Sequence, residues 1–148
     1  MYVDTSVVGG CEDPEFAAAS QALWSHFVDG RHTLVLSAHT VRELQGAPDA
    51  VRARVLEVPD ENQLALADSQ EAADLADAYI ARGVVGPGSQ ADALHVALAT
   101  VGRVDVLVSW NFRHIVNLGR IHLFHSVNIE RGYSVLEIRS PTEVLEYD

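Results

Sequence analysis

The chain has 148 residues and a formal net charge of −11, from 21 Asp and Glu residues against 10 Lys and Arg residues. All ten cations are arginine, so the chain contains no lysine. The negative charge disfavours a basic nucleic-acid-binding protein and adhesion to anionic membranes, because both rely on many cations. The lack of lysine excludes P-loop, protein-kinase and Schiff-base chemistry, each of which requires a lysine amine.

The length fits a single domain over residues 1–148, and 48% hydrophobic residues suffice for a buried core. Cys11 is the only cysteine, so no intrachain disulfide can form. We find no signal-peptide pattern and no segment approaching the roughly 18 apolar residues of a membrane span. These features favour the reducing cytoplasm as the location.

The first half of the chain predicts alternating strands and helices. A short strand over 1–3 ends at Asp4, and Thr5-Ser6 can cap a short turn of helix. Asp13-Pro14 is typical of a helix start, and the helix ends at Gly30. We then expect a strand over 33–36, a helix over 37–45 capped by Ser37, and a helix over 48–57.

The second half continues the alternation. We expect a helix over 68–82 opened by a capping box, a loop over 83–88, a helix over 89–100, a strand over 105–109, a short helix over 112–116, a helix over 119–131, a strand over 135–138 and a last turn over 142–146. Short apolar strands that alternate with helices are typical of a sheet buried on both faces. The predicted fold is therefore α/β, a three-layer α/β/α sandwich around a mostly parallel sheet.

Four polar residues are predicted at one edge of this sheet. Asp4 and Asn111 follow strands, whereas Glu43 and Asp92 lie near the starts of helices that follow strands or loops. Functional sites in parallel sheets form beyond the carboxyl ends of the strands. Carboxylate and amide oxygens suit a hard divalent cation, so the four residues are candidate ligands of Mg²⁺ or Mn²⁺.

Each candidate ligand also has a purely structural interpretation. Asp4 can cap the helix that follows it, and Glu43 can be a solvated helix residue paired with a neighbouring arginine. Ser89 and Asp92 together resemble a capping box. Asn111 is a natural turn residue. The metal interpretation depends on all four residues meeting at the same edge.

The segments that carry these residues resemble a PIN domain, and in particular VapC-type toxins of toxin–antitoxin systems. They are Asp4-Thr5-Ser6-Val7, Ser37-Ala38-His39-Thr40-Val41-Arg42-Glu43-Leu44, Ala91-Asp92-Ala93-Leu94-His95 and Leu107-Val108-Ser109-Trp110-Asn111-Phe112. The resemblance covers nearly the whole chain and implies a small α/β/α nuclease fold with metal-dependent cleavage of RNA. The three acids of the family fall on Asp4, Glu43 and Asp92. The fourth position, commonly Asp, falls on Asn111, which removes one negative charge from the site.

The resemblance also implies cofactors and partners. Mg²⁺ or Mn²⁺ is the expected cofactor, RNA the expected substrate and a cognate antitoxin protein the expected partner. Dimers are common among similar proteins, so a homodimer is a further expectation. Two other functions remain open: a catalytically weak or inactive PIN-like module that binds RNA or protein, and another metal-dependent phosphohydrolase with a small substrate.

Three side chains near the candidate ligands have accessory interpretations. Thr5 and Ser6 could each orient a water molecule or a phosphate, or could cap the first helix. His95 follows Asp92 by one helical turn and could orient that carboxylate, or could be a core histidine with satisfied hydrogen bonds.

Charge is unevenly distributed along the chain. Residues 57–77 carry seven acids and no arginine, whereas residues 110–136 carry a net charge of +2. In the second stretch, Arg113 and Arg120 are candidate RNA-phosphate contacts and Trp110 is a candidate base-stacking residue, although helix-surface and packing roles are alternatives. The first stretch predicts either a solvated face or a docking surface for a basic partner segment.

Overall fold

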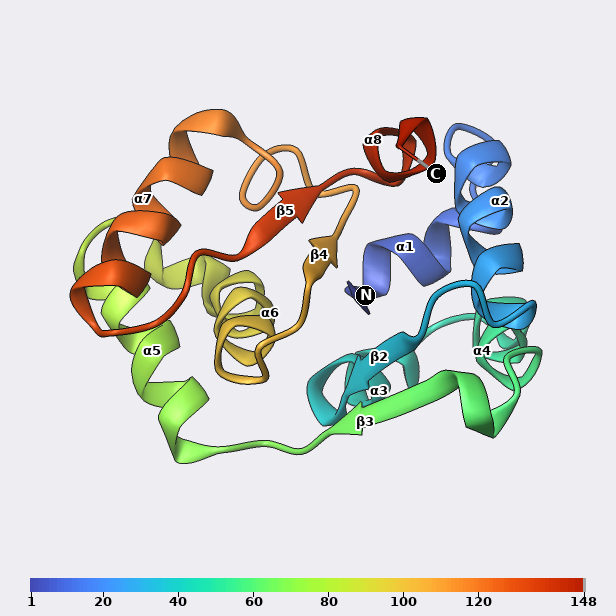
Figure 1. Ribbon diagram of the computed structural model, residues 1–148, viewed down its shortest axis with the longest axis horizontal. Helices are drawn as coiled ribbons and strands as arrows, with labels where there is room; N and C mark the ends of the chain where they lie inside the picture. The colour runs from blue at the N-terminus through green and yellow to red at the C-terminus, as the bar shows by residue number, and fades with distance from the viewer. Residues whose placement is uncertain (148) are drawn as a thin grey trace.

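A computed structural model describes residues 1–147 of the protein. Figure 1 shows a central sheet with helices gathered on either side. In chain order the elements are β1 (Tyr2–Val3), α1 (Thr5–Gly10), α2 (Ala17–Val28), β2 (Leu34–Ser37), α3 (Ala38–Leu44), α4 (Asp49–Leu56), the 3₁₀ turn η1 (Asp60–Asn62), β3 (Gln63–Leu66), α5 (Gln70–Ala81), the 3₁₀ turn η2 (Pro87–Ser89), α6 (Gln90–Val101), β4 (Val106–Val108), α7 (Leu118–Glu130), β5 (Glu137–Arg139) and α8 (Pro141–Glu146).

The five strands form one sheet in the order β3-β2-β1-β4-β5, and every neighbouring pair is parallel. The prediction of an α/β fold with a parallel sheet is therefore confirmed. The first strand to leave the N-terminus lies in the centre of the sheet although it has only two residues. Its register places Tyr2 beside Val35 on one side and beside Leu107 on the other.

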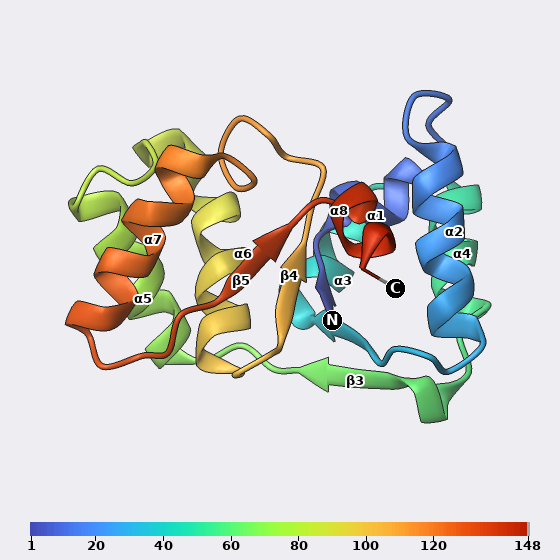
Figure 2. The same cartoon turned by 45° about the horizontal axis from the view of Figure 1, so that its top comes forward.

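Alternate strand residues face two separate hydrophobic cores. Tyr2, Leu107 and Ile138 pack with α5, α6 and α7, and Val3 and Val108 pack with α1, α2, α4 and α8. Figure 2 shows these two groups of helices on opposite sides of the sheet. Burial on both faces explains why β1, β2 and β4 are continuous apolar runs rather than alternating ones.

The predicted elements agree with the observed ones to within a few residues, with three differences. β3 was not among the expected strands, because its Gln-Leu-Ala-Leu sequence lacks the β-branched residues typical of a strand. The strand lies at the edge of the sheet, where Leu64 is 55% exposed. The predicted short helix over 112–116 is wrong, because this segment is a turn. The predicted helix start at Asp13-Pro14 is also early: Asp13 accepts the Glu15 N–H in a turn, and α2 begins at Ala17.

Polar residues follow or end the strands at the carboxyl edge of the sheet. β1 leads into Asp4, β2 ends in Ser37, and β4 and β5 lead into Ser109 and Ser140. Among residues 1–147 no helix has the length and apolar character needed to span a bilayer. Functional sites in parallel sheets form at this edge, beyond the carboxyl ends of the strands.

Candidate metal site at the carboxyl edge of the sheet

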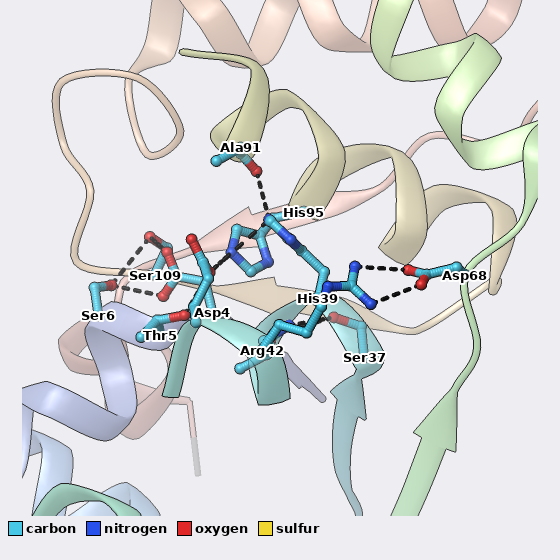
Figure 3. A network of polar contacts seen from close by, with 12 residues as sticks. Asp4, Thr5, Ser6, Ser37, His39, Arg42, Asp68, Ala91, His95 and Ser109 are labelled. Atoms are coloured by element: carbon cyan, nitrogen blue, oxygen red, sulfur yellow. Dashed lines mark hydrogen bonds and ion pairs between the residues drawn. The ribbon is translucent and has the colours of Figure 1, made fainter. Parts of the chain in front are cut away.

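Asp4 is the most buried carboxylate of this edge, with only 4% of its surface exposed. The Ser6 hydroxyl donates to Oδ1 at 2.6 Å and the Ser109 hydroxyl donates to Oδ2 at 2.6 Å (Figure 3). Asp4 is the N-cap residue of α1, but its side chain forms no capping hydrogen bond. The carboxylate is held by hydroxyls from two separate parts of the chain, and the backbone N–H of Val7 in α1 is a weaker influence on its pKa.

Burial raises the pKa of Asp4. The nearby imidazole of His95 and the hydrogen bonds from Ser109 and Ser6 act in the opposite direction, but burial is the largest influence. The ionised form of this carboxylate consequently costs folding free energy at neutral pH. A cation next to Asp4 would offset that cost.

Glu43 reaches the same edge from α3, with one-third of its side chain exposed (33%). Its Oε1 accepts a hydrogen bond from the Thr5 hydroxyl at 2.6 Å and lies 2.6 Å from Nε2 of His95. The neighbouring Arg42 instead binds both oxygens of Asp68, at 2.7 and 3.0 Å. The predicted pairing of Glu43 with a neighbouring arginine is therefore wrong, although the residue is exposed as expected.

The pKa of Glu43 is shifted in the opposite sense to that of Asp4. Partial burial acts to raise it, but the hydrogen bonds from His95 and Thr5 and the charge of the two imidazoles outweigh burial and lower the pKa to about 2. Glu43 is thus ionised throughout the physiological range. Thr5 directly follows Asp4, so its hydrogen bond attaches Glu43 to the residue next to Asp4.

A chain of buried polar groups holds His95 in place. His95 is 3% exposed, and its Nδ1 lies 2.7 Å from the hydroxyl of Tyr2. That hydroxyl lies 2.8 Å from the hydroxyl of Ser37, which accepts the backbone N–H of Thr40 and so caps α3. His95 is therefore a core histidine with satisfied hydrogen bonds, and it orients Glu43 rather than Asp92.

Asp92 lies in the first turn of α6 and is partly buried. Within residues 1–147 its carboxylate forms no hydrogen bond or ion pair. The Ser89 side chain does not cap α6, so the capping-box interpretation of Asp92 is wrong. Asp92 precedes His95 by one helical turn, which places the two residues on one side of α6, but no hydrogen bond joins Asp92 to Asp4 or Glu43.

Asn111 forms the turn that its structural interpretation predicts. Its Oδ1 accepts the backbone N–H of His114 at 2.9 Å, and its own N–H donates to the Ser109 hydroxyl at 2.9 Å. The amide oxygen thus already has a partner, and its second lone pair is what remains for a cation. Through Ser109, Asn111 is linked to the residue that holds Asp4.

Thr5 and Ser6 hold carboxylates and do not cap α1. Thr5 donates to Glu43, as described above, and Ser6 donates to Asp4 while accepting the backbone N–H of Trp110 at 3.0 Å. The capping interpretation of both hydroxyls is therefore wrong. Their role here is to position the two acids.

The candidate RNA contacts differ in whether their side chains are already engaged within the protein. Arg120 donates Nε–H to the carbonyl of Arg113 at 2.9 Å and also binds the carbonyl of Val84, so it joins two loops. The Arg113 side chain is exposed, and in the described part of the chain it forms no hydrogen bond or ion pair. Trp110 stacks on Phe16 at a centroid distance of 4.4 Å, which favours the packing interpretation of this tryptophan.

The sequence reasoning missed His39. Its Nε2 lies 3.9 Å from Oε1 of Glu43 and 3.1 Å from the backbone oxygen of Ala91. Ligand atoms of His39, Glu43 and His95 all lie within 4.8 Å of one another. The signal was present, because His39 and Glu43 are four residues apart and so share one face of α3.

The chain matches no family model and no curated protein in the comparisons. The residues themselves therefore carry the functional argument. Asp4 and Glu43 offer the oxygen ligands that hard divalent cations prefer, and the hydroxyls that donate to buried Asp4 are neutral. The chemistry of these oxygens fits Mg²⁺ or Mn²⁺, but among residues 1–147 only His39, Glu43 and His95 bring three ligand atoms within 4.8 Å of one another.

Proposed function

We propose that the protein is a metal-dependent ribonuclease of the PIN-domain type that acts as a toxin and is neutralised by a cognate antitoxin. The observation that carries this proposal is the buried Asp4 carboxylate at the carboxyl end of the central strand, with Glu43 hydrogen-bonded to the next residue, Thr5. A buried carboxylate that is costly to ionise and is held by neutral hydroxyls is typical of a site built for a cation.

Each residue has a distinct role in the proposed site. Asp4, Glu43 and Asp92 would hold Mg²⁺ or Mn²⁺, and Asn111 would contribute its remaining lone pair. When bound, such a cation lowers the pKa of water and neutralises charge on a phosphodiester. Ser6 and Ser109 fix both oxygens of Asp4, and Thr5 fixes one oxygen of Glu43, so these acids lose little conformational entropy when a cation binds.

The rest of the chain is compatible with an RNA substrate. With no lysine present, phosphate contacts would fall to arginine, and the exposed Arg113 directly follows the Trp110-Asn111-Phe112 segment. An antitoxin and a second copy of the chain are the partners that we propose from the resemblance, and the reducing cytoplasm is the location that we propose from the cysteine content. Cys11 is a free thiol, which is compatible with a reducing compartment.

The test is RNA cleavage by the purified full-length protein with Mn²⁺ or Mg²⁺, with EDTA, and with Asp4→Asn. We expect cleavage that needs the cation and that falls at least about a hundredfold in Asp4→Asn, because carboxylate ligands support several kcal/mol of charge stabilisation. Asp74→Asn is the matched control, since Asp74 is exposed on α5. Cleavage that survives EDTA or Asp4→Asn would show that the active site lies elsewhere.

A PIN-like module that binds RNA or protein without cleaving is the second candidate. The occupied amide oxygen of Asn111, where an acid is common in the family, favours it. Its signature is RNA binding with no cleavage at any divalent cation, and no binding of Mn²⁺ by isothermal titration calorimetry.

A further inference from the structure

The side chains of His39, Glu43 and His95 form a cluster whose chemistry differs from that of the carboxylate site. Two of the three ligand atoms are imidazole nitrogens, and all three lie within 4.8 Å of one another. Mg²⁺ prefers oxygen ligands, whereas imidazole nitrogen suits Zn²⁺ and the related transition-metal dications. Two histidines and a glutamate are also a recurrent zinc-ligand set.

We propose that His39, Glu43 and His95 form a binding site for a transition-metal dication of the Zn²⁺ class, separate in chemistry from the Mg²⁺ or Mn²⁺ site. His39 and Glu43 project from one face of α3 four residues apart, and His95 approaches from α6. Tetrahedral ligands at zinc distances lie about 3.3 Å apart. The His39–Glu43 distance is 3.9 Å and would have to shorten to this value, and the His95–Glu43 distance is 2.6 Å and would have to lengthen. Small side-chain movements suffice for both changes.

The hydrogen bonds behind His95 support this assignment. A histidine that binds a metal usually donates its other N–H to a fixed acceptor, which sets the tautomer and the ring orientation. Nδ1 of His95 lies 2.7 Å from the Tyr2 hydroxyl, which can accept this proton while donating to Ser37 at 2.8 Å. That tautomer leaves Nε2 with a lone pair directed toward Glu43, and a cation between them replaces the proton that they otherwise share.

The surroundings of His39 decide how a metal ion reaches the cluster and which contact it replaces. The His39 side chain is 12% exposed and that of Glu43 is 33% exposed, so the cluster is reachable from solvent while His95 closes its inner side. Nε2 of His39 lies 3.1 Å from the carbonyl oxygen of Ala91, and a metal bound through this nitrogen would exchange that contact for its own.

The first experiment is titration of the metal-free, full-length protein with Co²⁺, followed by displacement with Zn²⁺. We expect visible d–d absorption that saturates at one Co²⁺ per chain and disappears when Zn²⁺ is added. His39→Gln should weaken binding at least about tenfold, because even indirect partners of metal ligands contribute tenfold or more. The control His122→Gln, at an exposed position of α7, should bind as the wild type does.

Two further measurements keep the outcome unambiguous. X-ray absorption of the Zn²⁺-loaded wild-type protein should show scattering from two imidazoles, which requires no variant to fold. Asp92→Asn should leave Co²⁺ absorption unchanged. The proposal is overturned if the wild type gives no such absorption, if His39→Gln binds normally, or if Asp92→Asn abolishes binding.

The shared Glu43 leads to one consequence, which rests on the proposed ribonuclease function. A transition metal on His39 and His95 would draw Glu43 away from the carboxylate site, so Zn²⁺ should inhibit Mn²⁺-dependent RNA cleavage and His39→Gln should relieve that inhibition. If no variant cleaves RNA, the ribonuclease proposal fails while the Co²⁺ titration still decides the transition-metal site. If cleavage occurs and Zn²⁺ inhibits both proteins equally, competition through this cluster is wrong.

Discussion

Two acidic regions of the molecule have opposite characters. The acidic segment, residues 57–77, carries seven carboxylates, and all seven belong to exposed residues. The carboxylate site has far fewer acids, yet Asp4 is buried and Glu43 is held by a hydroxyl and an imidazole. A high density of acidic residues in the sequence is therefore a poor indicator of a cation site, because such a site requires carboxylates that are fixed and partly desolvated.

The largest difference is expected in catalysis. Asp92→Asn should lower RNA cleavage at least about a hundredfold while leaving the free energy of unfolding within about 0.5 kcal/mol of wild type, because its carboxylate makes no contact that the fold needs. Cleavage assays and urea denaturation measure the two quantities. Asp77→Asn, the same substitution in the acidic segment, should change neither; a loss of stability in Asp92→Asn would make Asp92 structural.

Sequence reasoning predicted much of this arrangement. The alternation of apolar runs and helices predicted the parallel sheet, and the order of the strands brings Asp4 and Ser109 together. The spacing of residues could not reveal which groups hold the acids. Thr5 and Ser6 looked like helix caps, and the contacts of His95 with Glu43 and Tyr2 join residues 52 and 93 positions apart in the chain. Such contacts follow from tertiary packing and leave no local pattern.

The next difference is in stability, between the buried polar groups that hold His95 and an exposed pair in the acidic segment. Tyr2→Phe should lower the free energy of unfolding by about 1–3 kcal/mol, because it removes the hydroxyl between buried His95 and Ser37 and leaves Nδ1 of His95 unpaired, whereas Ser37 keeps its hydrogen bond to Thr40. Tyr133→Phe is the matched control, since its hydroxyl donates to exposed Glu71 of the acidic segment and should contribute less than about 0.5 kcal/mol. Equal effects in urea denaturation would show that the buried chain of polar groups adds no stability.

The two carboxylates of the site should respond oppositely to pH in metal-free protein. Burial raises the pKa of Asp4, so ionised Asp4 destabilises the fold above its folded pKa, and Asp4→Asn should be more stable than wild type at pH 7. The pKa of Glu43 is lowered to about 2, so its stabilisation is present above the unfolded pKa and lost as pH falls toward 2.

Glu43→Gln should consequently destabilise the protein at pH 7 by less than about 1 kcal/mol, since the side chain is partly solvated, and the difference should shrink between about pH 4.5 and 2. Thermal unfolding with EDTA from pH 2 to 8 measures both variants. If Asp4→Asn is less stable than wild type at pH 7, its hydrogen bonds to Ser6 and Ser109 outweigh the cost of the buried charge.

The smallest effect is expected in the acidic segment itself. Arg42 binds both oxygens of Asp68, but the two side chains are 50% and 54% exposed, so water screens the pair and the side chains lose conformational freedom in forming it. Asp68→Asn should therefore cost about 0.2–1 kcal/mol at low salt, and less in 1 M NaCl, where the Debye length falls to about 3 Å. Urea denaturation at both salt concentrations measures the change. A cost that matches Tyr2→Phe and persists in high salt would mean that exposed acids, when paired in this geometry, stabilise the protein as strongly as the buried groups do.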